Sequence, residues 1–202
     1  LGDVYKRQET PRVLIDLFNG IGNKTYEAYI RKIDDTTVEG YRFVNGWAPQ
    51  HKVFFYAKFN QPIQSLDVFH LNTPAGTDEL QGRDVKAVAT FKDGMKELLV
   101  KVAISSVSCT NAKLNLEKEM TGWNFDNVHQ VAIQKWNDVL SRIEIEGTPR
   151  QKTIFYTAMY HAFIAPNLYC DVNGDFRGID DKVYRNNKFK NYTTLSLWDT
   201  YR

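Results

Sequence analysis

The first hundred residues show the alternation of polar and apolar positions that is typical of β-strands. A short apolar run at residues 12–18 precedes two stretches, 26–33 and 36–44, which are separated by two polar residues as in a hairpin. Residues 53–59 are apolar on both alternating faces, which indicates a central strand buried between two layers. Several strands without intervening helices predict an antiparallel β-sandwich.

A second hairpin is predicted further along the same region. Apolar residues alternate through 85–91 and again between Leu98 and Ile104. Between the two stretches lies the dipeptide Asp93-Gly94, which is a strong signal for a turn that joins two paired strands. We therefore expect these two strands to pair with each other.

The second half of the sequence has helical periodicity. Apolar residues recur at steps of three and four between residues 124 and 144, which predicts an amphipathic helix. Residues 148–151, Thr-Pro-Arg-Gln, supply an N-cap, a proline at the first helical position and a capping-box glutamine. Residues 154–164 are apolar nearly all round, so we expect this second helix to be buried on most sides and to end before Pro166. A polar loop, 165–193, follows.

The composition narrows the functional classes. Of the 202 residues, 43% are hydrophobic and 25% are charged, which is enough apolar surface for a folded core. The net charge is only +2, whereas a nucleic-acid-binding face needs a clear excess of Lys and Arg. No run approaches the ~20 consecutive apolar residues that span a membrane. The two cysteines, Cys109 and Cys170, fall in different predicted domains and are expected to be free thiols.

Both ends of the sequence indicate a gene fragment. Residues 3–8 are an in-frame translation of a transposon-end adaptor used in sequencing libraries, so we expect residues 1–8 to be a non-native scar. Residues 194–202 have the pattern of the first turns of a helix, with no stop signal after them. A helix this short is only marginally stable alone.

Residues 171–175, Asp-Val-Asn-Gly-Asp, superficially resemble a calcium-binding loop. In an EF-hand loop the glycine stands sixth and a bidentate glutamate stands twelfth. Here Gly174 stands fourth and Lys182 stands twelfth, so we interpret the segment as a turn. None of the four histidines pairs with another His or Cys at metal-ligand spacing.

Two segments carry a tryptophan that could contact a sugar. Trp198 and Asp199 combine an aromatic ring, which can cover an apolar sugar face, with a carboxylate that accepts hydrogen bonds from hydroxyl groups. Spacing alone favours a simpler alternative, in which Trp198 is a core residue and Asp199 pairs with Arg202 on a helix surface. Trp47, in a loop with Gly and Pro, is suited to stack on a ligand or to close one end of the sandwich.

Several short motifs, in order along the chain, resemble those of one enzyme family. In the predicted sandwich they are Val-Glu-Gly-Tyr-Arg at 38–42, Gly-Trp at 46–47, Val-Phe-Phe-Tyr-Ala-Lys-Phe at 53–59 and Ile-Ser-Ser-Val-Ser at 104–108, followed by Asn111, Ala112, Leu116 and Glu119. In the helical part they are Phe-Tyr-Thr-Ala-Met-Tyr-His at 155–161, Pro-Asn at 166–167, Asp171, Gly174, Phe-Arg-Gly-Ile-Asp at 176–180, Asn-Tyr-Thr at 191–193 and Ser-Leu-Trp-Asp-Thr-Tyr-Arg at 196–202. The sequence thereby resembles glycoside hydrolase family 92, the calcium-dependent exo-acting α-mannosidases, over essentially residues 10–202.

The resemblance implies an enzyme in which a β-sandwich packs on an (α/α) helical toroid, with the active site at their interface. It implies hydrolysis of terminal α-mannosides of glycans with inversion, which needs a carboxylic acid for the leaving oxygen and a carboxylate that activates water. It assigns Trp198 as a wall and Asp199 as a hydroxyl acceptor of the subsite for the terminal mannose. It also implies a calcium ion that contacts sugar hydroxyls, and a periplasmic or extracellular location.

The resemblance further implies that the catalytic acid, the base and the calcium ligands lie C-terminal to this chain. The 202-residue chain is therefore expected to be inactive. The Gly-rich beginning of the family's sandwich is expected to precede residue 9.

We accordingly predict a multidomain β + α protein with a truncated helical part. Its segments are the scar at 1–8, a partial N-terminal β-sandwich at 9–110, a linker with an amphipathic helix at 111–147 and the start of the (α/α) toroid at 148–202. The competing hypothesis is a non-catalytic carbohydrate-binding or structural β-sandwich module with a helical tail. The tail discriminates between them, because a toroid needs a buried helix followed by an unfinished one and a binding module does not.

Overall fold

The computed structural model describes residues 10–46, 49–185 and 188–193, which form two compact units. The first, called here the sandwich unit, comprises the described residues up to Thr121 together with Cys170–Phe189. The second, called the helical unit, comprises Gly122–Tyr169 and the described residues from Lys190 onward.

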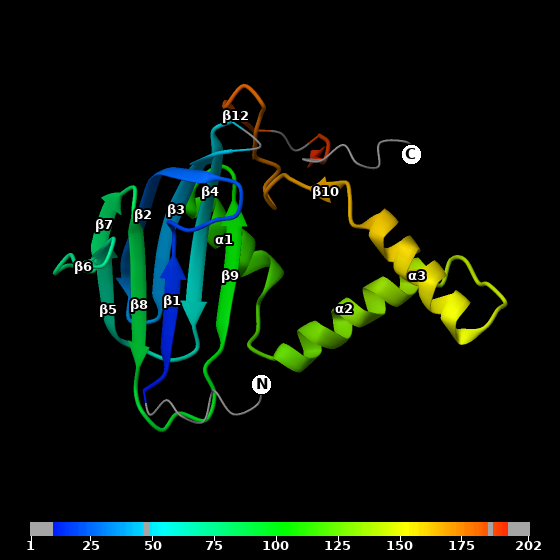
Figure 1. The fold of residues 1–202 in the computed structure, drawn as a ribbon, viewed down its shortest axis with the longest axis horizontal. Coiled ribbons are helices and arrows are strands. Elements are labelled where there is room, and N and C mark those ends of the chain that lie inside the picture. Colours follow the sequence, from blue (N-terminus) through cyan, green and yellow to red (C-terminus); the bar gives the residue numbers. More distant parts are fainter. Residues whose placement is uncertain (1–9, 47–48, 186–187, 194–202) are drawn as a thin grey trace. The chain divides into compact units, whose positions relative to one another are not determined.

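The sandwich unit is built on two antiparallel sheets, which confirms the predicted fold class (Figure 1). One sheet has the order β1–β8–β5–β6, with bounds Arg12–Asp16, Val85–Phe91, Ile63–His70 and Thr73–Pro74. The other has the order β7–β2–β3–β4–β9, with bounds Glu79–Gly82, Lys24–Asp34, Thr37–Asn45, His51–Phe59 and Val100–Ser105.

The hydrophobic core lies between these sheets. The alternating pattern of strand β8 shows how this core arises from the sequence. Every second residue of the strand is fully buried, and the residues between them are partly exposed; the buried ones are Val85, Ala87, Ala89 and Phe91. Successive side chains of a strand point to opposite faces, so the sequence alternation becomes one buried face per strand. The cluster of buried residues comprises Leu17, Ala28, Ile30, Val38, Phe59, Ile63, Leu66, Val68, Val85, Ala87, Ala89 and Phe91.

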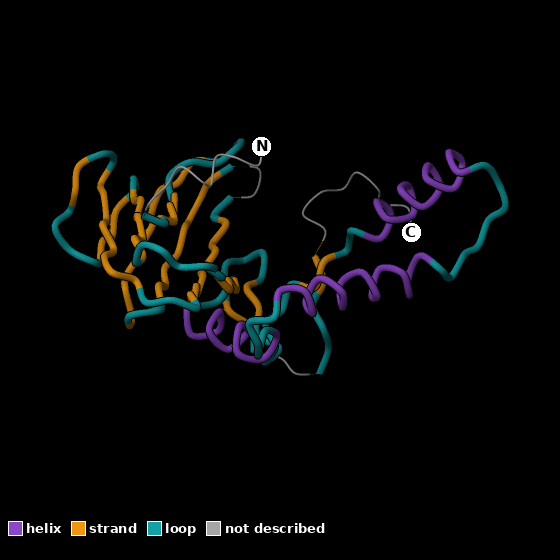
Figure 2. The backbone as a smooth tube through the Cα atoms, turned by 90° about the horizontal axis from the view of Figure 1, so that it is seen from below, coloured by secondary structure: helices purple, strands orange, loops and turns teal. Residues whose placement is uncertain are grey.

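Strand β4 is central and covered on both faces, as its sequence predicts. It lies between β3 and β9, and Phe59 faces the core between the sheets. On the opposite face Tyr56 packs against Ala112 and Leu116 of helix α1 (Cys109–Glu119). The two layers are therefore a sheet on one side and a helix on the other. Figure 2 shows strands in orange and helices in purple.

The predicted turn of the first hairpin is shifted by one residue. Asp34 is still part of β2 and pairs with Thr37, so the turn residues are Asp35 and Thr36. The reason is local, because the Asp34 carboxylate accepts hydrogen bonds from the backbone N–H of Thr36 at 2.7 Å and from its hydroxyl at 3.0 Å. These bonds close the turn one position later.

The hairpin predicted around Asp93-Gly94 is wrong. Gly94 does adopt a turn conformation, with φ of 72°, but β8 pairs with β1 and β5 while β9 pairs with β4 in the other sheet. The connection crosses from one sheet to the other, and Met95 and Leu98 of this connection pack against the core. The turn therefore forms as predicted, but the packing of these two side chains leads the chain into the other sheet, so the two strands do not pair.

The helical unit contains both predicted helices. Helix α2 (Phe125–Leu140) begins at the N-cap Asn124, and helix α3 (Pro149–Phe163) begins at Thr148 with a complete capping box. The prediction that the second helix is buried on most sides is wrong for the described residues, since Met159 is its only buried residue. No described helix is long and apolar enough to cross a membrane.

Two features of the structure lie outside the sequence predictions. Helix α1 falls within the stretch interpreted as a linker and packs on the sandwich, although the domain boundaries themselves stay predictions. The loop at 165–193 contains two short strand pairs. Strands β10 (Asn167–Leu168) and β13 (Tyr192–Thr193) pair in the helical unit, and β11 (Phe176–Arg177) and β12 (Val183–Tyr184) pair in the sandwich unit.

Candidate functional site

The residues assigned to the mannose subsite by resemblance, Trp198 and Asp199, lie outside the described residues. The same holds for Arg202 and for Trp47. Their roles therefore stay predictions. The described residues instead bring together a different polar cluster, on the segment Cys170–Phe189, which lies between the two parts of the helical unit in sequence but belongs to the sandwich unit.

A buried carboxylate holds the beginning of this segment. Asp171 is only 6% exposed, and its Oδ2 accepts hydrogen bonds from Ser105 Oγ at 2.7 Å and Asn111 Nδ2 at 2.8 Å. Its Oδ1 accepts from Asn115 Nδ2 at 2.7 Å, and Asn115 Oδ1 accepts the backbone N–H of Val172. A buried charge is tolerated only when its hydrogen-bonding capacity is satisfied. Both asparagines reach it because residues four apart share one face of α1.

The segment from Asp171 to Asp175 is a turn, as its sequence predicts. The backbone N–H of Gly174 donates to the carbonyl of Asp171 at 2.8 Å, and Gly174 has φ of 88°, which glycine adopts without strain. The sequence analysis did not foresee that this turn carries the buried carboxylate.

The described residues do not fit a calcium site. Both carboxylate oxygens of Asp171 already accept hydrogen bonds from protein donors. Among the described residues no group of three or more His, Cys, Asp or Glu side chains could hold a metal ion.

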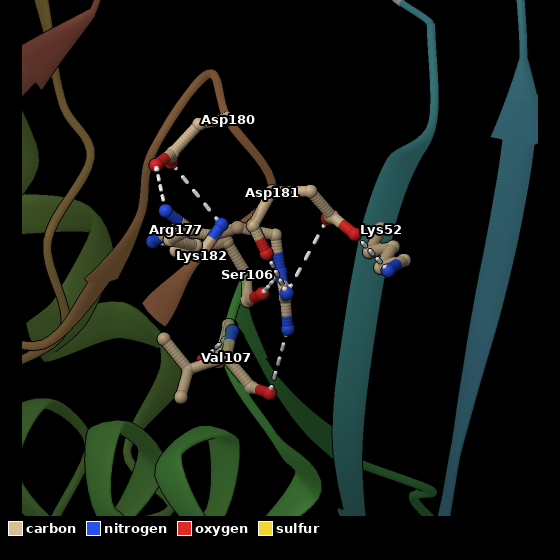
Figure 3. Close-up of polar contacts among 8 residues, drawn as sticks. Lys52, Ser106, Val107, Arg177, Asp180, Asp181 and Lys182 are labelled. Carbon is tan, nitrogen blue, oxygen red and sulfur yellow. Dashed lines mark hydrogen bonds and ion pairs between the residues drawn. The ribbon is translucent and has the colours of Figure 1, made fainter. Parts of the chain in front are cut away.

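Arg177 holds the hairpin β11–β12 to the end of β9 (Figure 3). Its Nε donates to the carbonyl of Ser106 at 2.8 Å, and its Nη2 donates to the carbonyl of Val107 at 3.4 Å. Its Nη1 donates to the backbone carbonyl and the side chain of Asp181 at 2.7 and 3.3 Å. The guanidinium group thus joins three backbone carbonyls and one carboxylate.

Asp181 also forms an ion pair with Lys52 of β4, which connects the hairpin to the sheet. The hydrogen bond from Lys52 and the nearby charges of Lys52 and Arg177 hold the pKa of Asp181 below its usual range. Asp181 is therefore ionised at neutral pH and engaged by two cations. It is a structural anion of the hairpin.

The tip of the hairpin presents a second carboxylate. Asp180 accepts hydrogen bonds from the hydroxyl of Tyr184 at 2.8 Å and from the backbone N–H of Lys182 at 3.2 Å. The hydrogen bond from Tyr184 lowers the pKa of Asp180 and raises the pKa of the Tyr184 hydroxyl. The Tyr184 ring stacks on Phe176 with centroids 5.5 Å apart, and Ile179 is fully exposed. An ionised carboxylate beside an aromatic ring is suited to accept hydrogen bonds from hydroxyl groups.

A general acid needs the opposite electrostatic setting, because its pKa must be raised to retain a proton near neutral pH. Among the described carboxyl groups, every pKa that is shifted lies below its ordinary value. These groups are Asp16, Asp34, Asp180 and Asp181. For Asp16 and Asp34, burial favours the protonated form, but hydrogen bonds to the ionised form outweigh it. These four groups are suited to accept hydrogen bonds and not to donate a proton.

Sequence reasoning missed the residues that hold this segment in place. Asn111 and Asn115 are four residues apart, and this spacing could have placed them on one face of a helix. Their partner Asp171, however, lies 56 to 60 residues away in the sequence. Lys52 and Asp181 are 129 residues apart. No local pattern indicates pairings over such distances.

Comparison with known proteins places the chain in a family. Residues 4–105 match the glycosyl hydrolase family 92 N-terminal domain, and residues 111–202 match the glycosyl hydrolase family 92 catalytic domain. The solved family GH92 α-mannosidase BT3965 from Bacteroides thetaiotaomicron is 31% identical, with a TM-score of 0.90 over 96% of this chain and 27% of its own. It has also been solved in complex with mannoimidazole.

Two more distant structures share the fold. They are the GH92 family glycosyl hydrolase ccman5, at 22% identity and a TM-score of 0.83 over 94% of this chain and 26% of its own, and the GH92 inverting mannosidase BT2199 from Bacteroides thetaiotaomicron VPI-5482, at 22% identity and a TM-score of 0.82 over 97% and 27%. No curated protein matches the chain. The chain thus spans about a quarter of the length of these relatives. Two consecutive domain matches in one chain confirm the resemblance, and the chain belongs to glycoside hydrolase family 92.

Proposed function

We propose that this chain is the β-sandwich and the beginning of the catalytic domain of an inverting exo-α-mannosidase that acts on terminal α-mannosides of glycans. The observation that carries the proposal is the succession of two family domains in one chain, at 31% identity to an α-mannosidase that has been solved with mannoimidazole. The enzyme acts on mannose-containing glycans in the periplasm or outside the cell.

In this proposal the chain supplies binding and scaffold, and the remainder of the catalytic domain supplies the chemistry. Trp198 forms a wall of the terminal-mannose subsite and Asp199 accepts hydrogen bonds from its hydroxyls. The acid, the base and the calcium ligands belong to the remainder. The lowered pKa values of Asp180 and Asp181, which arise from their hydrogen bonds to Tyr184 and Lys52, support this division, since both groups are held ionised.

The test compares the purified 202-residue chain with a longer protein that carries the complete catalytic domain. We expect the longer protein to release mannose from p-nitrophenyl α-mannoside and from α-mannobioses, and the chain alone to release none. Proton NMR of the first turnovers would show β-mannose if the reaction inverts. Chelation with EDTA should abolish activity, and added calcium should restore it. Hydrolysis by the chain alone would contradict the proposed division.

The same pair of proteins tests the alternative of a non-catalytic carbohydrate-binding module. In that case titration calorimetry would show that the 202-residue chain binds α-mannosides, and the longer protein would bind without hydrolysing them. For the subsite, Trp198→Ala and Asp199→Asn in the longer protein should each raise KM. The matched change Asp93→Asn, at an exposed residue of the connection between β8 and β9, should leave KM unchanged and so separates this subsite from a general loss of carboxylates.

A further inference from the structure

The tip of the hairpin β11–β12 presents a carboxylate, an ammonium group and a tyrosine to solvent. Asp180 Oδ2 accepts a hydrogen bond from the Tyr184 hydroxyl at 2.8 Å, and the Lys182 ammonium lies 3.7 Å from the same oxygen. The Lys182 side chain is 77% exposed and Tyr184 is 43% exposed. Figure 3 shows Asp181 directed at Lys52 and Asp180 on the other side of the hairpin. The tip groups are thus separate from the ion pair that holds the hairpin to the sheet.

The hairpin holds the groups of its tip in a fixed arrangement. A Cβ atom at Gly178 would lie 2.6 Å from Cε2 of Tyr184 and 2.7 Å from Oδ1 of Asp180, so glycine is needed for the ring to lie this close. Phe176 stacks on one face of the Tyr184 ring at an interplanar angle of 19°. The ring is therefore held from two sides with its hydroxyl on the carboxylate. Groups that are fixed before a ligand arrives lose little conformational entropy on binding.

The groups at the tip favour a neutral ligand that carries hydroxyl groups. The charges of Asp180 and Lys182 cancel, so the pair attracts neither an anion nor a cation strongly. A hydroxyl group is both a donor and an acceptor, so one of two neighbouring hydroxyls can donate to the Asp180 carboxylate while the other accepts from the Lys182 ammonium. The apolar C–H groups of a sugar ring can cover Ile179, which is fully exposed. Burial of the tip under a further part of the protein would instead remove an ionised carboxylate from water, which is costly.

We propose that this hairpin tip is a second sugar-binding site, which holds a mannosyl residue of the glycan other than the terminal one. The inference rests on the proposed function, because that function supplies the mannose-containing ligand. Asp180 and Lys182 bind two neighbouring hydroxyls, and Tyr184 fixes the orientation of the Asp180 carboxylate. An oligosaccharide that occupies this site and the terminal-mannose subsite together gains affinity, whereas a single mannose cannot occupy both at once.

NMR titration of the 202-residue chain with methyl α-mannoside tests the site directly. We expect the backbone amide signals of Ile179, Asp180 and Lys182 to shift and to saturate with a Kd in the millimolar range, because the contact has few hydrogen bonds. The signal of Ala89, which is buried in the core, should not shift. Trp198→Ala should leave the shifts at the tip unchanged, which separates this site from the terminal-mannose subsite.

Matched variants identify the groups that carry the binding. Asp180→Asn keeps the shape of the side chain but removes its charge, and should raise Kd about tenfold. Lys182→Met, which keeps the apolar stem, and Tyr184→Phe, which keeps the ring, should each raise Kd about fivefold. Asp93→Asn, at an exposed aspartate outside the hairpin, should leave Kd unchanged. Resistance of residues 170–189 to protease verifies that the hairpin of each variant remains docked.

In the longer protein that carries the complete catalytic domain, the site should act through KM. Asp180→Asn should raise KM about tenfold for an α-mannotetraose and leave kcat unchanged, while KM for methyl α-mannoside stays the same. If the longer protein hydrolyses no α-mannoside, the proposed function fails. The NMR titration then still decides whether the tip binds a sugar.

Three outcomes would overturn the proposal. The first is an absence of saturable shifts at the tip in the titration with methyl α-mannoside. The second is binding at the tip that Asp180→Asn does not weaken. The third is a rise in KM that is equal for methyl α-mannoside and the tetraose in Asp180→Asn, because Asp180 would then act on the terminal mannose.

Discussion

The sandwich unit and the helical unit have equally clear sequence patterns but very different burial. In the sandwich unit the alternating residues of β8, such as Val85 and Phe91, are completely buried. In the helical unit, α2 has a pronounced apolar face but no buried residue, and Phe125 on that helix remains 67% exposed. Among its described residues only Met159 of α3 is buried. An apolar pattern therefore specifies an element, whereas burial depends on the neighbours that meet its face.

The helical unit shows how far local interactions carry a structure. The capping box of Thr148 and Gln151 defines where α3 begins. The two helices meet through the rings of Trp136 and Tyr160, whose centroids lie 4.5 Å apart. The hydroxyl of Tyr156 also donates a hydrogen bond to the carbonyl of Ile143 at 3.0 Å. These contacts join a pair of helices but do not make a core.

The sharpest test of this contrast is a pair of matched truncations. Phe91→Ala, in the fully buried core, should lower the free energy of unfolding of the sandwich unit by about 3–5 kcal/mol, because it leaves a cavity. Phe125→Ala on α2 should cost no more than about 0.5 kcal/mol, as a change at an exposed site. Unfolding in denaturant, with hydrogen exchange as the probe, measures the free energy lost in each of the two variants. Equal losses would show that the apolar face of α2 is buried in solution.

The second test concerns the segment that returns to the sandwich. Asp171→Asn should destabilise the docked segment by about 1–3 kcal/mol, because its amide nitrogen replaces one acceptor oxygen and would face either the donor of Asn115 or the donors of Ser105 and Asn111. Limited proteolysis of residues 170–189 and urea unfolding measure the loss. Asp180→Asn, the same change at the exposed hairpin tip, is the control. If both variants resist protease like the original chain, the buried carboxylate does not hold the segment.

A smaller effect is expected at the start of α3. Thr148→Ala removes the side chain that accepts the hydrogen bond from the backbone N–H of Gln151, which should cost about 1 kcal/mol of local stability. Amides in the first turn of α3 should then exchange about fivefold faster. Thr153→Ala removes a hydroxyl within the same helix, which donates to the carbonyl of Pro149 at 3.0 Å, and should not loosen that turn.

The smallest effect is a pH dependence of the hairpin. Since the hydrogen bond and charge of Lys52 lower the pKa of Asp181, the ionised form stabilises the folded hairpin. This contribution is complete above the ordinary pKa of 3.8 and disappears as the pH falls through the lower pKa of the folded state. Cleavage of the hairpin by pepsin should therefore accelerate as the pH falls below 3.8 more than in Asp181→Asn, which has no carboxyl group at this position to titrate. Parallel pH profiles of the two proteins would contradict this role.

Much of the fold could be predicted because its signals are local. The alternation in β8, the period of α2 and the capping box of α3 each reflect interactions within a few residues. The failures have a common cause. The connection at Gly94 crosses between sheets because the side chains of Met95 and Leu98 pack in the core, which no turn propensity describes.

The candidate site could be predicted only in part, for the same reason. The motif at 171–175 was readable as a turn, yet its buried carboxylate depends on donors from β9 and α1. In the sandwich, strand β5 was also not predicted, because a register shift between Ile63 and Ser65 breaks the alternation of buried and exposed residues along it.

By itself, the sequence determined the class of the molecule: an antiparallel sandwich followed by capped helices, with motifs of one glycoside hydrolase family. Periodicity, caps and turns are short-range, so they can be read along the chain. Only the tertiary structure decided that residues 170–189 return to the sandwich, since the bonds of Asp171 and Arg177 join segments about 60 to 70 residues apart. It also decided which apolar faces are covered, because burial depends on what packs against a strand and not on the strand alone.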